Sequence, residues 1–157
     1  MRTNFKQILF EKMRENPKIF VVTADLGYKM WDDIKQKFPT RFLNVGAAES
    51  LMIGTCIGLS YQGYIPVAYS ITPFLLYRGF ESIRNYLSHE RVPVKLLGSG
   101  LDTDYLHDGF SHHDFTYREI LKLLDIDCIT PNSVVDLEVC TENWLNSNQP
   151  SFLGLRR

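Results

Sequence analysis

A carboxylate stands at the start of the longest uncharged segment of this chain. Glu49 follows Asn44-Val45-Gly46-Ala47-Ala48, a pattern typical of a strand, a glycine turn and the first turn of a helix. The next 28 positions, Ser50 to Tyr77, contain no charged residue. An acid at a helix start also complements the helix dipole, but at the mouth of an apolar surface it is suited to proton transfer. We therefore predict Glu49 as a candidate acid–base residue.

The uncharged segment itself is long enough for a membrane span, since about 20 apolar residues suffice. Glycines and prolines interrupt it, however, and Gln62-Gly63 has the pattern of a turn. We predict a buried helix and a buried strand instead, with some surface facing a partner. Gly54 and Gly58 share one helix face, where small residues permit close approach of a partner or of the sheet.

A second segment, Ile71 to Arg84, is rich in aromatic residues. Phe74 and Tyr77 are candidates for a platform that holds a flat heterocycle. Phe80 is assigned to the core, because it shares a helical stripe with apolar residues three and seven positions later.

A third segment, Asp108-Gly109-Phe110-Ser111-His112-His113-Asp114, ends a polar loop that starts at Leu101. A loop of this length indicates function. Histidines beside acids raise the possibility of a metal site, but adjacent histidines rarely converge on one ion. Polar contacts with a substrate are therefore favoured over metal binding.

The elements that position these residues alternate between helix and strand. Helices are expected over 4–15, 31–37, 48–61, 74–88, 115–124 and 134–145, the last capped by Ser133. Strands are expected over 19–23, 42–45, 65–69, 94–97, 127–130 and 152–155. This order predicts one α/β domain over residues 1–157, doubly wound, with a mostly parallel central sheet.

The overall composition indicates which partners and which cellular environment to expect. Of the 157 residues, 17 are Lys or Arg and 18 are Asp or Glu, which gives a net charge of -1 and no polyanion footprint. Nucleic acid is therefore not an expected partner. Cys56, Cys128 and Cys140 lack metal-ligand spacing and are interpreted as reduced core thiols. The N-terminus lacks the pattern of a signal peptide, so a cytoplasmic protein outside the membrane is expected.

Common phosphate-binding and hydrolase motifs are missing, as is the metal-diphosphate motif of thiamine enzymes. Three collinear stretches nevertheless resemble the pyrimidine-binding domain of transketolase-type thiamine diphosphate enzymes, which include deoxyxylulose-phosphate synthases. The family reads R-x-x-x-x-G-I-A-E-Q, then F-L-x-x-R-x-x-x-Q-I-R, then D-G-P-T-H-Q. The counterparts are Arg41 to Ser50, Phe74 to Arg84 and Asp108 to His113. The resemblance covers nearly the whole chain.

Several positions depart from the family pattern. Ser50 and His113 each replace a Gln, and Phe110-Ser111 replaces Pro-Thr. Thr130 stands where many transketolases place an Arg that helps to hold a sugar phosphate, which weakens the expectation of a phosphorylated substrate. The family's diphosphate-binding and C-terminal domains have no counterpart within these residues.

The resemblance implies a cofactor and a set of site residues. Thiamine diphosphate would lie between this domain and a diphosphate-binding subunit that holds Mg²⁺, and Glu49 would hydrogen-bond a pyrimidine nitrogen. The remaining implied cofactor contacts are Phe74, Tyr77 and Asp25. His112 is the second implied catalytic residue, and the implied substrate contacts are Asp108, His112, His113 and Arg78.

The function implied is that of one subunit of a split transketolase. Such an enzyme transfers a two-carbon ketol unit from a ketose to an aldose, here in a heterotetramer with two copies of each subunit. Three alternatives remain open: a β-subunit of a 2-oxoacid dehydrogenase, a deoxyxylulose-phosphate synthase type of component, and a non-catalytic regulatory subunit.

Overall fold

The computed structural model describes all residues, Met1–Arg157, and is built on a six-stranded sheet. The strand order is β2-β1-β3-β4-β6-β5, and every neighbouring pair is parallel. The predicted α/β class is confirmed, with a sheet that is wholly rather than mostly parallel. The strands are β1 (Ile19–Thr23), β2 (Phe42–Asn44), β3 (Ile65–Ile71), β4 (Lys95–Ser99), β5 (Asp127–Ile129) and β6 (Ser151–Leu155).

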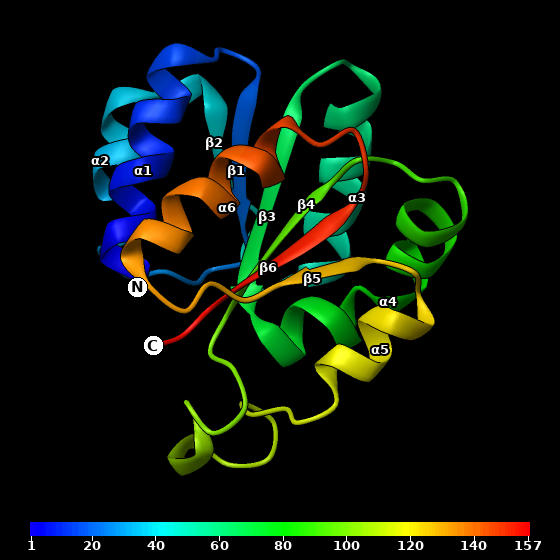
Figure 1. The fold of residues 1–157 in the computed structure, drawn as a ribbon. Coiled ribbons are helices and arrows are strands. Elements are labelled where there is room, and N and C mark those ends of the chain that lie inside the picture. Colours follow the sequence, from blue (N-terminus) through cyan, green and yellow to red (C-terminus); the bar gives the residue numbers. More distant parts are fainter.

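Helices cover both faces of the sheet (Figure 1). One face packs against α1 (Arg2–Glu15), α2 (Asp32–Lys37) and α6 (Val134–Asn146). The other packs against α3 (Glu49–Tyr61), the helical segment η2-α4-η3 (Phe74–Arg78, Phe80–Ser82 and Ile83–His89) and α5 (Tyr117–Leu123). Neighbouring strand residues such as Val21 and Val22 enter opposite cores, because side chains alternate across a strand. Two short 3-10 turns, η1 (Pro39–Arg41) and η4 (Leu106–Asp108), complete the chain.

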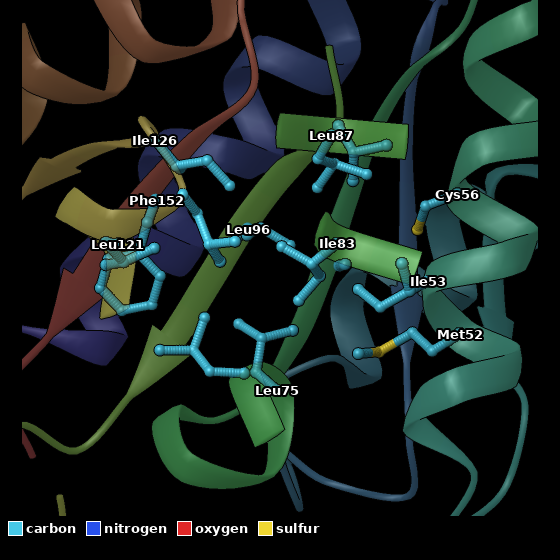
Figure 2. Packing of buried hydrophobic residues seen from close by; sticks show 14 of the residues in the cluster. Met52, Ile53, Cys56, Leu75, Ile83, Leu87, Leu96, Leu121, Ile126 and Phe152 are labelled. Carbon is cyan, nitrogen blue, oxygen red and sulfur yellow. The ribbon is translucent and has the colours of Figure 1, made fainter. Parts of the chain in front are cut away.

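The core on the α3 side fixes the two helical segments that carry the candidate residues. Met52 and Ile53 of α3 share a cluster with Leu75 of η2, Ile83 of η3 and Leu96 of β4 (Figure 2). All five side chains are fully buried. Each buried side chain of this size contributes about 1.5–3 kcal/mol, so the first turn of α3 and the η2 segment are held in a defined relation.

The segment after β3 departs from the single α-helix predicted over 74–88. Two π-helical stretches, η2 and η3, flank one turn of α-helix. Gly79 lies at the junction, where an added Cβ would come within 2.8 Å of Ile53 Cγ1 and 3.1 Å of the Leu75 carbonyl oxygen. The close packing of this backbone on α3 therefore requires a residue without a Cβ atom at position 79. The predicted stripe is confirmed, since Phe80 packs on the core beside buried Ile83 and Leu87.

The uncharged segment forms a helix and a strand as predicted, namely α3 and β3. Gly54 and Gly58 face away from the sheet, and nothing lies within 4 Å of a Cβ added to either. Their alternative role in packing on the sheet is therefore wrong. No helix in the structure combines the length and the apolar character needed to cross a bilayer.

The interpretation of all three cysteines as core thiols needs correction. Cys56 is buried, Cys140 is half-buried and Cys128 is exposed, and all three are free thiols. Cys128 lies on β5, the edge strand of the sheet, where one flank has no neighbouring strand to cover it. A short edge strand leaves such side chains open to solvent.

The long loop between β4 and α5 projects beyond the carboxyl edge of the sheet, where the chain is yellow-green in Figure 1. Its two ends are joined by an antiparallel bridge between Asp102 and Asp114. The Asp102 carboxylate also pairs with Arg118 and Arg156, at 2.9 and 3.0 Å. The loop is thus anchored at its base, while its tip extends outward.

Candidate functional site

Glu49 opens α3 directly after the turn that follows β2. Gly46 makes this turn with a φ of +78°, a conformation that favours glycine. The Asn44 side-chain oxygen accepts hydrogen bonds from the backbone N–H groups of Gly46 and Asp25, at 3.0 and 2.9 Å. The Glu49 residue is only 2% exposed. The turn therefore places a buried carboxylate at the carboxyl edge of the sheet, where ligands bind in open α/β folds.

The partner of this carboxylate is Arg78, the last residue of η2. Arg78 Nη1 donates to both oxygens of Glu49, at 2.9 and 3.1 Å. The Ser70 hydroxyl lies 3.5 Å from Glu49 Oε1, and the Ser50 hydroxyl donates to the Arg78 carbonyl at 2.5 Å. Because the Arg78 side chain is 49% exposed, the ion pair joins the buried acid to solvent.

An aromatic face and a histidine complete this group. The Arg78 guanidinium carbon lies 3.7 Å from the centre of the Phe74 ring. The His112 ring meets Phe74 edge-on, with 4.9 Å between ring centres. His112 Nδ1 lies 2.9 Å from the Ser111 hydroxyl. Three segments that the sequence analysis singled out separately are therefore in contact with one another. We call Glu49, Arg78, Phe74 and His112 the acid–aromatic group.

Tyr77 and His113 face a different space. The Tyr77 hydroxyl lies 2.8 Å from Thr116 Oγ1, and burial raises the pKa of this phenol. His113 Nδ1 lies 3.0 Å from the Gly109 carbonyl oxygen. Both side chains line a cavity of about 470 Å³, the aromatic hollow, formed by Pro73, Tyr77, Phe110, Ser111, His113, Asp114, Phe115 and Thr116. Tyr77 and His113 thus lie beside the acid–aromatic group without a hydrogen bond to its members.

Asp25 and Asp108 lie outside the group. Asp25 follows β1, exchanges hydrogen bonds with Asn44 at 2.9 and 3.3 Å, and lines a separate surface hollow. The Asp108 carboxylate lies 3.2 Å from His107 Nε2, in the exposed turn η4. Neither makes a hydrogen bond or ion pair with Glu49, Arg78 or His112, so their predicted roles stay predictions.

A cavity with three basic side chains was missed by the sequence analysis. The basic cavity, about 360 Å³, has no acidic side chain in its wall, which consists of Arg2, Thr3, Lys6, Leu26, Gly27, Tyr28, Lys29, Met30, Tyr69, Ile71 and Tyr105. Arg2 donates to the Tyr105 hydroxyl at 3.3 Å. The only sequence signal was the spacing of Arg2 and Lys6, one helical turn apart on α1.

Comparison with known proteins places the chain in a family. The profile described as transketolase, pyrimidine binding domain, matches residues 1–157. The chain belongs to this family. This membership confirms the resemblance inferred from Arg41 to Ser50, Phe74 to Arg84 and Asp108 to His113.

Two named relatives are similar in sequence to this chain over most of its length. One of the subunits of the apulose-4-phosphate transketolase of Actinobacillus succinogenes is 32% identical over 121 residues, which are 76% of this chain and 39% of that protein. The 1-deoxy-D-xylulose-5-phosphate synthase of Dehalococcoides mccartyi is 29% identical over 158 residues, or 98% of this chain and 24% of that protein. The chain spans less than half the length of the curated relatives it matches.

A solved structure described as a split gene transketolase, inactive beta4 tetramer, has the same fold. Its TM-score is 0.87 at 28% identity, over 99% of this chain and 50% of that one. In the transketolase pyrimidine-binding domain described here, no three His, Cys, Asp or Glu side chains gather closely enough to hold a metal ion.

Proposed function

We propose that this chain is the pyrimidine-binding subunit of a split, thiamine diphosphate-dependent transketolase. The observation that carries the proposal is the acid–aromatic group, in which a buried carboxylate, an aromatic face and a histidine meet at the carboxyl edge of the sheet. In a pyrimidine-binding domain, these are the features that a flat, nitrogen-containing ring requires.

The residues present fit the aminopyrimidine part of the cofactor. Phe74, which is half-buried beneath the Arg78 guanidinium, offers an aromatic face for stacking once Arg78 moves away, and Glu49 offers a carboxylate that hydrogen-bonds a ring nitrogen and holds a proton there. When bound, thiamine diphosphate supplies a carbon nucleophile for cleavage next to a ketose carbonyl. We propose that His112, which contacts Phe74, hydrogen-bonds substrate oxygens. We further propose that Tyr77 and Asp25 border the cofactor site, and that Asp108, His113 and Arg78 contribute to substrate binding.

The positive charge of the basic cavity favours a sugar substrate that carries an anionic substituent. Arg2 and Lys29 lie in its wall, with no carboxylate to neutralise them there. Tyr69 and Ile71 of β3 also line it, and Ser70, between them, faces Glu49. The cavity therefore begins one residue away from the acid–aromatic group, on the other face of β3. An anion held there would place a sugar chain across the end of this strand.

The proposal includes a separate diphosphate-binding subunit that holds Mg²⁺, in a cytoplasmic enzyme of carbohydrate metabolism. A heterotetramer with two copies of each chain is the proposed assembly. It is supported by the open face of α3 around Gly54 and Gly58 and by a relative whose name makes it one of the subunits of a transketolase. A second candidate is a deoxyxylulose-phosphate synthase type of component, favoured by a likeness that spans 98% of this chain.

Co-expression with a diphosphate-binding transketolase subunit tests the proposal. The purified complex is supplied with thiamine diphosphate, Mg²⁺ and a panel of ketose donors with aldehyde acceptors. Transfer of two carbons from ketose to aldose is expected. Condensation of a 2-oxoacid with the same acceptors would instead support the synthase alternative. If the two chains associate but none of these reactions occurs, the catalytic assignment is wrong.

A further inference from the structure

Asp114 carries a buried oxygen that has no hydrogen-bond partner. The residue is 8% exposed, and its Oδ1 accepts hydrogen bonds from the Thr116 backbone N–H and hydroxyl, both at 2.7 Å. Its Oδ2 is buried and has none. Because an unpaired buried acceptor loses its water without replacement, it destabilises the chain in this state. An oxygen of this kind can accept a hydrogen bond from a donor that another chain brings into the hollow.

The surroundings of this oxygen are aromatic and open. Asp114 lines the aromatic hollow together with Phe110, which is 91% exposed, and Phe115, which is more than half exposed. The His113 ring lies between these two, with 6.0 and 5.4 Å between ring centres. Most residues that line the hollow, from Phe110 to Thr116, belong to the projecting loop, whose course Figure 1 shows. Exposed aromatic clusters of this kind mark contact surfaces.

We propose, building on the proposed function, that the aromatic hollow receives an arginine side chain of the diphosphate-binding subunit. The guanidinium group is planar, stacks on aromatic rings and donates several hydrogen bonds in one plane. One of these bonds goes to Asp114 Oδ2, while the rings of Phe110 and Phe115 cover the faces of the guanidinium group. Arginine and aromatic residues dominate the centres of protein interfaces.

Other occupants match the hollow less well. An anionic sugar is repelled by the Asp114 carboxylate and finds Arg2 and Lys29 in the basic cavity instead, where Lys6 is paired with Asp33. A small neutral ligand leaves most of the Phe110 ring in water. A neutral donor from the partner leaves the carboxylate charge without compensation among apolar rings. A cationic side chain on a protein surface is attracted by the carboxylate, compensates its charge and brings enough protein surface to cover the Phe110 ring.

The test measures association of the two purified subunits without cofactor, by isothermal titration at low and high salt. In Asp114→Asn, the side-chain oxygen retains both Thr116 bonds, and an amide donor replaces Oδ2. We expect Asp114→Asn to weaken association at least tenfold and to flatten its salt dependence. Phe110→Ser is expected to weaken association by a similar factor. Matched controls on the exposed β5 side of the domain, Asp127→Asn and Leu123→Ser, should bind like the wild type.

The outcomes separate this inference from the proposed function. If the wild-type chain does not bind the diphosphate-binding subunit, both fail. If it binds and Asp114→Asn binds equally well, the inference is overturned and the proposed function stands. If association is unchanged but Asp114→Asn alters kcat/KM in the assembled enzyme, the hollow is a small-molecule site and the inference is also overturned. Circular dichroism and thermal melting confirm that each variant is folded.

Discussion

Arg78 holds both carboxylate oxygens of Glu49 through a single guanidinium nitrogen, at 2.9 and 3.1 Å. The same guanidinium lies over the Phe74 ring, with 3.7 Å from its carbon to the ring centre. A planar, hydrogen-bond-donating group of this chain therefore already occupies the acid and the aromatic face proposed for the aminopyrimidine. A bound ring must displace Arg78 from this place.

Replacing Arg78 should therefore improve cofactor binding. Because the ion pair is half exposed, its loss corresponds to about 1 kcal/mol, so Arg78→Met should lower the Kd of the assembled complex for thiamine diphosphate about fivefold. Isothermal titration measures the Kd, with Arg84→Met, a solvent-facing neighbour, as the matched control. A weaker affinity in Arg78→Met would make Arg78 a cofactor ligand instead.

Glu49→Gln should abolish most activity while leaving the assembly intact. An amide keeps the shape of the side chain but cannot hold a proton on the ring nitrogen, and groups of this kind contribute roughly 100- to 10,000-fold. Steady-state kinetics give kcat, and sedimentation velocity checks the assembly. Glu81→Gln on the exposed side of α4 is the control. Near-normal turnover in Glu49→Gln would leave Glu49 as a helix-end acid only.

Substitutions of His112 and Asp108, both in the projecting loop, should differ in their effects on kcat/KM. His112 contacts Phe74 within the acid–aromatic group, whereas the Asp108 carboxylate pairs with His107 in an exposed turn. Loss of a buried polar contact costs about 1–3 kcal/mol, so His112→Ala should lower kcat/KM by roughly 5- to 150-fold. Asp108→Ala should lower it less, and cofactor affinity should be unchanged in both. Equal losses would mean that the loop closes over the substrate.

The isolated chain should bind thiamine diphosphate poorly. It offers a stacking face and an acid, but no group of carboxylates or histidines that can hold a metal ion beside a diphosphate. Isothermal titration of the purified chain, with Mg²⁺, should give a Kd far weaker than that of the complex. Sub-micromolar binding by the chain alone would contradict the division of the site between two subunits.

Lys95 should make stability depend on pH. Its side chain is 1% exposed and donates to the carbonyl oxygens of Ser147 and Gln149, at 2.7 and 2.8 Å. Burial lowers its pKa from 10.5 to about 8. Between these pH values the unfolded chain binds more protons at Lys95 than the folded chain does, so this residue by itself raises the free energy of unfolding with pH, by about 3 kcal/mol. Urea denaturation at both ends of this range should show a free energy of unfolding that changes more favourably with pH in the wild type than in Lys95→Met, because the buried thiols and phenols are common to both proteins.

The sequence was sufficient to predict the fold because each buried strand and each amphipathic helix leaves a local pattern. The resemblance to the family implied that Glu49, Phe74 and His112 belong to one site, and the structure brings them together because each follows a parallel strand and the carboxyl ends of such strands share one edge. The pairing of Arg78 with Glu49 was not predictable in this way. It depends on the π-helical turn of η2, which changes the direction of each side chain relative to an α-helix and leaves no mark in the apolar stripe.

The basic cavity and the unpaired oxygen of Asp114 were also beyond sequence analysis. The cavity joins Arg2, Lys29 and Tyr105, which come from three elements far apart along the chain. Asp114 was visible only as one acid among several in a polar loop. Its significance arises from burial, which no local pattern records for a residue outside helices and strands.

The π-helical turn of η2 directs two consecutive residues to two different surfaces. Tyr77 reaches Thr116 at the aromatic hollow, and Arg78 reaches Glu49 in the acid–aromatic group. A single peptide bond thus joins Tyr77, which lines the proposed subunit contact, to Arg78, which pairs with Glu49. If assembly shifts Tyr77 and the adjoining Arg78 backbone with it, the Glu49 ion pair shifts too, and the free energies of subunit association and of cofactor binding are then coupled. By thermodynamic linkage, cofactor then strengthens the assembly by the same factor by which assembly strengthens cofactor binding.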